Sequence, residues 1–251
     1  MTVAASQSSW GKAYKYFDLK LVFLIGIAVF EIGSLVCGKK TLGFDFRCAQ
    51  LLTDLVGVAQ NSTTLIVGRA ITGLGAAGVL AGCYCIIACS VAAHKRPAYT
   101  GILGATYGVA SVVGPLLGGA FTDKATWRWC FYINLPVGGV SAAIIFFTFS
   151  TPQVQRRDPA RKADLREKIL QMDLPGTFII LAGIVCLLLA LQWGGTSKAW
   201  NSSDVIGTLV GFGLLTITFV VVEYFQGDRA MLVPHVLKKR EIWAGGAFSF
   251  L

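Results

Sequence analysis

The sequence predicts an all-α fold, a polytopic bundle of transmembrane helices. Hydrophobic residues make up 55% of the chain and charged residues only 14%, a balance at which a water-soluble domain would struggle to stay dispersed. Apolar blocks recur at close to the ~20 residues that a helix needs to cross a bilayer. We expect six full spans, at Lys20–Cys37, Thr63–Ala92, Tyr99–Phe121, Cys130–Ser150, Leu174–Gln192 and Asp204–Phe225.

The basic residues support this reading, because they gather in alternate loops. The loops rich in lysine and arginine precede the first span and follow the second, fourth and sixth spans. Their basic residues are Lys12, Lys15, Lys20, Lys95, Arg96, Arg156, Arg157, Arg161, Lys162, Arg166, Lys168, Arg229, Lys238, Lys239 and Arg240. The positive-inside rule places these loops in the cytoplasm. The excess of 22 basic over 13 acidic residues is therefore topological, and we expect no nucleic-acid partner.

The first span carries one carboxylate, Glu31, and the second carries one arginine, Arg69. An ionisable group inside a span costs several kcal/mol unless it is paired or hydrated, so both are functional candidates. The alternative for Glu31 is a polar gap between helices, where it titrates nothing. The alternative for Arg69 is a side chain that extends to the membrane surface. The seven cysteines have no zinc or disulfide spacing, and we expect neither a metal nor a cofactor.

The third span contains the most informative stretch, Gly101–Gly119. Its glycines and its proline would make a poor helix in water, but in lipid they leave smooth faces for close packing and a point of bending. These small or helix-bending positions are Gly101, Gly104, Gly108, Gly114, Pro115, Gly118 and Gly119.

This stretch resembles motif C, the antiporter motif in the fifth helix of major facilitator superfamily exporters, with Ala110 where the motif usually has glycine. Three further stretches are similar to the same family. Motif B of the fourth helix is resembled by Arg69 with Gly73, Gly75, Ala76 and Ala77. The sequence WRWCFYINLP at 127–136 resembles the junction of the fifth and sixth helices in fourteen-span drug:H⁺ antiporters. The motif A loop between helices two and three is resembled by Gly11, Lys15, Asp18 and Lys20. In that loop, Lys15 stands at the motif's aspartate and Asp18 at a glycine, which puts its charge relay in doubt.

The resemblance implies a partial major facilitator fold, truncated at both ends. Residues 1–150 would be the end of helix 2 to helix 6, 151–172 a basic cytoplasmic linker, 173–225 the two extra linking helices, and 226–251 a loop and the start of helix 9. Met1–Trp10 is too short to span, and Ile242–Leu251 begins a span that stops.

Residues 38–57 interrupt the family pattern. The codons of this segment can contain the donor-like, branch-like and acceptor-like sequences of an intron. The offset between donor and acceptor is 57 − 38 = 19 codons, so removal of the intron would leave the reading frame intact. One hypothesis is therefore a translated intron; the alternative is a genuine extracytoplasmic loop.

The implied activity is proton-coupled efflux of a small organic compound, in which Arg69 biases a nearby carboxylate, with Glu31 as the first candidate. The expected partners are lipid, protons and a small-molecule substrate, in the plasma membrane or alternatively a vacuolar or vesicular membrane. A second hypothesis is a transport-incompetent fragment or a mispredicted gene product. A membrane enzyme is the third and weakest, because the cytoplasmic helix ends lack clustered histidine, aspartate or a nucleophile.

Overall fold

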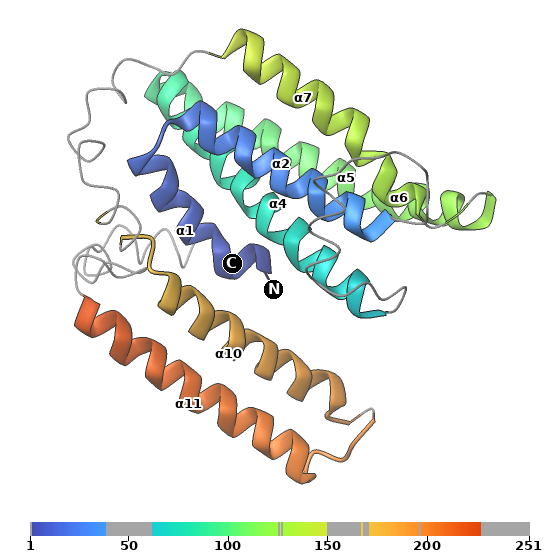
Figure 1. Ribbon diagram of the computed structural model, residues 1–251, viewed down its shortest axis with the longest axis vertical. Helices are drawn as coiled ribbons and strands as arrows, with labels where there is room; N and C mark the ends of the chain where they lie inside the picture. The colour runs from blue at the N-terminus through green and yellow to red at the C-terminus, as the bar shows by residue number, and fades with distance from the viewer. Residues whose placement is uncertain are drawn as a thin grey trace. The chain divides into compact units, whose positions relative to one another are not determined.

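The computed structural model describes residues 2–38, 62–124, 126, 128–149, 167, 171–195 and 197–226 (Figure 1). They form the helices α1 (Thr2–Tyr16), α2 (Leu19–Gly38), α4 (Ser62–Ser90), α5 (Arg96–Lys124), α6 (Trp129–Tyr132), α7 (Asn134–Thr148), α10 (Leu174–Trp193) and α11 (Ser203–Gln226), with the 3₁₀ turn η1 (Ala93–Lys95). Residues 39–57 of the hypothetical insert, most of the 151–172 linker and the start of a ninth helix lie outside these residues.

The described residues contain six helical stretches that are long and apolar enough to cross a membrane, at Leu19–Gly38, Leu65–Ser90, Ala93–Lys124, Trp129–Thr148, Pro175–Trp193 and Ser203–Gln226. Each overlaps one of the six predicted spans, and the prediction of an all-α transmembrane bundle is confirmed.

Two segments differ locally from the prediction. The N-terminal helix continues through Gly11 to Tyr16, so the turn before α2 consists only of Phe17 and Asp18. The fourth span consists of two helices, α6 and α7, which meet at Ile133. Pro136 has no N–H to donate to the carbonyl of Tyr132 four residues earlier, which explains the break at this point.

The chain divides into two compact units. One unit contains residues 14–161, in which α2 packs between α4 and α7 (Figure 1). The other contains Val3–Ala13 of α1 together with the α10–α11 hairpin.

In the first unit, glycines bring the backbones of α2 and α4 together. A Cβ on Gly33 would lie 2.8 Å from the Cα of Thr72, and a Cβ on Gly75 would lie 2.6 Å from the Cα of Phe30. Real Cβ atoms do not come this close, so both positions require glycine. The pairing is antiparallel, since positions later in α2 meet positions earlier in α4.

These glycines repeat every seven residues on both helices, at Gly26 and Gly33 on α2 and at Gly68, Gly75 and Gly82 on α4. A seven-residue repeat keeps one face of a helix against its neighbour, as in a coiled coil, and small residues at a membrane helix interface allow close van der Waals contact. The α2–α4 pair is therefore specified by the spacing of its glycines.

In the second unit, Asp173 organises the start of α10. Its backbone is left-handed, with φ 47°, and Oδ1 accepts hydrogen bonds from Gly176 N at 3.0 Å and from Gln226 Nε2 of α11 at 2.8 Å. A Cβ on Gly176 would lie 2.8 Å from the carboxyl carbon of Asp173, which explains the glycine in the Asp-x-x-Gly sequence. Asp173 thus caps α10 and ties its start to the end of α11.

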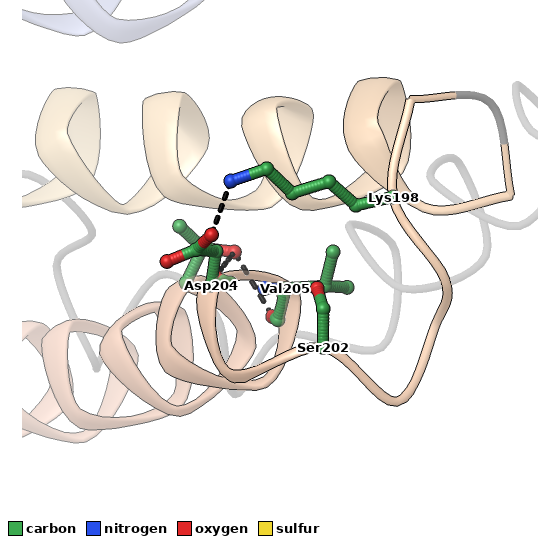
Figure 2. A network of polar contacts seen from close by, with 5 residues as sticks. Lys198, Ser202, Asp204 and Val205 are labelled. Atoms are coloured by element: carbon green, nitrogen blue, oxygen red, sulfur yellow. Dashed lines mark hydrogen bonds and ion pairs between the residues drawn. The ribbon is translucent and has the colours of Figure 1, made fainter.

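Trp200 folds over the turn between α10 and α11. Its ring would contact a Cβ on Gly194 at 2.7 Å, and Gly195 has φ +76°, so neither glycine has room for a side chain without strain. Lys198 forms an ion pair with Asp204 and lies 5.1 Å from the centre of the Trp193 ring. Figure 2 shows this ion pair beside Ser202, whose Oγ accepts a hydrogen bond from Val205 N. The turn is therefore held by its own residues.

We expect Gly75→Leu to destabilise the chain through overpacking, by about 1–3 kcal/mol or more, because the new side chain meets the Phe30 backbone. The measurement is loss of helical circular dichroism as SDS is added to the chain in mixed micelles. Gly104→Leu on α5 is the matched control, since a Cβ there meets nothing within 4 Å. Equal stability of the two variants would contradict the packing argument.

Candidate functional site

The candidate functional site lies in the first unit, along α2 and its neighbours α4, α6 and α7. It contains two ionisable residues that lie within the spans, Glu31 on α2 and Arg69 on α4. The described residues contain no group of three or more His, Cys, Asp or Glu side chains that would hold a metal ion.

Arg69 is exposed, and its guanidinium carbon lies 5.5 Å from the centre of the Phe131 ring. A cation over an aromatic face is stabilised by about 0.5–2 kcal/mol, more when water is excluded. Phe131 belongs to α6, in the middle of the WRWCFYINLP stretch, so this stretch positions Arg69.

Glu31 points the other way, towards α7. A Cβ on Gly138 would fall on Glu31 Oε1 and lie 2.8 Å from its carboxyl carbon, so the carboxylate occupies the space that a side chain at 138 would fill. Both carboxylate oxygens are buried without a hydrogen-bond partner in the described part of the chain. No ion pair between Glu31 and Arg69 occurs there, and the expected pairing is not made in this arrangement.

The WRWCFYINLP stretch also attaches to α2. The hydroxyl of Tyr132 donates a hydrogen bond to the carbonyl oxygen of Gly38, and Asn134 Nδ2 donates to Ser34 Oγ at 3.3 Å. A membrane-interface belt would require only amphipathic rings. These contacts give the stretch a second task, because they fix the C-terminal half of α2 against α6 and α7.

The residues that resemble motif A lie on both sides of the short turn before α2. Asp18 caps α2, its Oδ1 accepting from Lys20 N at 3.0 Å, while Lys20 Nζ donates to the carbonyl of Phe146 near the end of α7 at 2.7 Å. A lysine at that place satisfies a helix-end carbonyl and complements the helix dipole. Gly11 and Lys15 lie within α1.

The motif C glycines lie on α5, a continuous helix through Pro115. A Cβ built on any of them would meet nothing within 4 Å of the described chain; they are Gly101, Gly104, Gly108, Gly114, Gly118 and Gly119. The tight contact and the bend expected of this stretch therefore stay predictions.

Several contacts around the site were not anticipated from the sequence. Gly33 and Gly75 bring α2 against α4, Asn134 and Tyr132 hold α2 against the α6–α7 segment, and Tyr14 donates to the carbonyl of Gly78 at 2.8 Å. The seven-residue glycine repeat was a readable signal for the first pair. The polar contacts carry no comparable signal, because they join residues about 64 to 100 positions apart.

Together, the apolar helices and the ionisable groups between them define an integral membrane protein of the polytopic helical class. The family model described as Major Facilitator Superfamily matches residues 1–251, and the chain belongs to this superfamily.

Its relatives are named as transporters. It is similar to the MFS-type transporter GME11371 of Pestalotiopsis microspora, with 54% identity over 250 residues that cover 100% of this chain and 42% of that protein. The MFS-type efflux pump MFS1 of Arthroderma benhamiae is 44% identical, with 100% and 42% covered. The efflux pump roqT of Penicillium rubens is 43% identical, with 99% and 42% covered. The chain thus spans about two fifths of these relatives' length, and their names agree with a transporter rather than an enzyme.

Proposed function

We propose that the protein containing this chain exports a small organic compound in exchange for protons. The observation that carries the proposal is the similarity, over the whole chain, to proteins named as efflux pumps. In this role the motif C glycines of α5 would pack against a partner helix, and the plasma membrane is the expected location. The substrate class is a drug, toxin or secondary metabolite.

The proton-coupling part of the proposal is supported by two ionisable residues within the spans of the first unit. The guanidinium carbon of Arg69 lies 5.5 Å from the centre of the Phe131 ring, and the carboxylate oxygens of Glu31 are buried against α7 without a hydrogen-bond partner in the described residues. Charged groups inside a membrane mark ion and substrate pathways. A helix shift that brings the guanidinium to within about 4–6 Å of the carboxylate would favour its ionised form and release its proton.

The experiment uses the full product of the gene that encodes this chain, expressed in host cells without efflux pumps of their own. Export of a fluorescent amphiphilic compound is measured with an inward proton gradient and again after a protonophore collapses it. We expect export that stops with the protonophore. Export that continues unchanged would contradict proton coupling, and no export of any compound in a broad panel would contradict efflux.

In that assay we expect Arg69→Ala to abolish export while membrane insertion and protein level stay unchanged. Arg69→Lys keeps the charge but presents a compact ammonium in place of the planar guanidinium over Phe131, so we expect partial activity. Phe131→Leu is the matched test of the positioning contact and should reduce export less than Arg69→Ala. Unchanged compound accumulation in Arg69→Ala would remove Arg69 from the mechanism.

A second candidate is that residues 1–251 do not transport on their own. The observation that favours it is their coverage of 39–42% of the relatives' length. Alternating access requires two helical halves that rock about a shared site. The same assay with residues 1–251 alone decides: proton-dependent export by that chain would reject this candidate.

We further propose that the segment 38–57 contains a translated intron of 57 − 38 = 19 codons, because α2 and α4 do not need the residues after Gly38 in this segment to connect. Gly68 of α4 packs against Cys37 of α2, because a Cβ added to Gly68 would lie 3.2 Å from the backbone N of Cys37. Ser62, the first residue of α4, lies about 9 Å from Gly68 along the axis of α4. Because packed helices lie about 8–10 Å apart, the end of α2 and the start of α4 are roughly 13 Å apart. Residues 58–61 would bridge up to about 17 Å.

We therefore expect deletion of residues 39–57 to leave the α2–α4 hairpin intact. The measurement is the SDS-dependent loss of helicity in mixed micelles, with the undeleted chain as control. A large loss of stability on deletion would indicate a genuine loop. Sequencing the transcript provides the independent check, and a majority of copies that retain these codons would reject the intron.

A further inference from the structure

The buried carboxylate of Glu31 is coupled by geometry to one neighbouring helix. Its carboxyl group fills the space left by the missing side chain of Gly138 on α7, and both of its oxygens are inaccessible to solvent. One turn further along α2, Ser34 accepts the long hydrogen bond of 3.3 Å from Asn134 of α7. The burial of Glu31 therefore depends on contact between α2 and α7.

No cation of the described residues forms an ion pair with the carboxylate of Glu31. Helix α7 carries no titratable side chain. On α6, Tyr132 donates its hydroxyl to Gly38 O, and on α4 the guanidinium of Arg69 lies over Phe131. On α2 itself, Lys20 donates to Phe146 O. The remaining titratable groups of these elements are thiols and one phenol, namely Cys37, Cys83, Tyr84, Cys85, Cys89 and Cys130.

An unpaired buried charge costs far more than a neutral carboxyl group in the same place. While α7 lies against α2, Glu31 fits as the neutral acid. If α7 moves away, water reaches the carboxyl group, and the ionised form is solvated.

We propose that Glu31 is the residue whose proton is exchanged with the opening and closing of the contact between α2 and α7. On closing, the carboxylate binds one proton from water and becomes the carboxylic acid. On opening, the O–H bond breaks, the proton returns to water and the carboxylate remains. This inference rests on the proposed proton-coupled function and assigns its proton step to one pair of helices.

Infrared spectroscopy of residues 1–251 in lipid nanodiscs tests the protonation without any transport. The C=O stretch of a protonated carboxylic acid is distinct from the bands of a carboxylate. We expect this band at neutral pH in the unmodified chain and its loss in Glu31→Gln, which keeps the shape of the neutral acid. An acid band that Glu31→Gln leaves unchanged, or no such band at neutral pH, would overturn the proposal.

Two adjacent glycines provide the matched test of the coupling to α7. In Gly138→Ala the new methyl group falls on the carboxyl group and must displace it, so we expect the Glu31 band to titrate with at least tenfold weaker proton affinity. Gly139→Ala adds the same methyl group where nothing lies within 4 Å, and its titration should match the unmodified chain. Identical titration of both variants would overturn the coupling. Helicity by circular dichroism confirms that each variant is folded.

The outcomes for this inference and for efflux are separable. A band that responds to Glu31→Gln and Gly138→Ala supports the inference, whatever the export assay gives with the full gene product. Protonophore-sensitive export that Glu31→Gln leaves unchanged would keep the efflux proposal and overturn the role of Glu31 in it.

Discussion

The backbone contact between α2 and α4 is the constraint on which the rest of the candidate site depends. Lipid tails are as apolar as the helices, so hydrophobic burial does little to hold two transmembrane helices together. Close backbone contact at Gly33 and Gly75 provides the attraction instead. With α4 fixed on one side of α2, the opposite side is left for α7. This arrangement of the three helices determines where Arg69 of α4 and Glu31 of α2 lie.

The polar contacts around α2 act differently from the glycines. Tyr132 and Asn134 approach α2 from the α6–α7 segment, and Lys20 reaches the end of α7 from the start of α2. Each is a single hydrogen bond, and interhelical hydrogen bonds in membranes contribute only about 0.6–2 kcal/mol. The α2–α4 contact, which brings two backbones together, is therefore the tighter one, and a rearrangement between α2 and α7 would break only single hydrogen bonds.

Much of the fold was predictable from the sequence, because a transmembrane span must be apolar over its whole length and helical to satisfy its backbone. The bounds of α10, predicted at Leu174–Gln192 and found at Leu174–Trp193, illustrate this. The direction in which Glu31 and Arg69 point was not predictable. An isolated ionisable residue in an apolar run reveals that a partner or cavity is needed, but which neighbouring helix supplies it depends on rotation about the helix axis. Here Glu31 lies against Gly138 and Arg69 against Phe131, on different helices.

The turn between α10 and α11 has a consequence for biosynthesis. Trp200 packs on Gly194 and Gly195, Asp204 pairs with Lys198, and Gln226 binds Asp173, all within one continuous segment. These contacts run from the start of α10 to the end of α11 and lie within the hairpin itself. They suit the segment to partition from the translocon into lipid as a pair of helices.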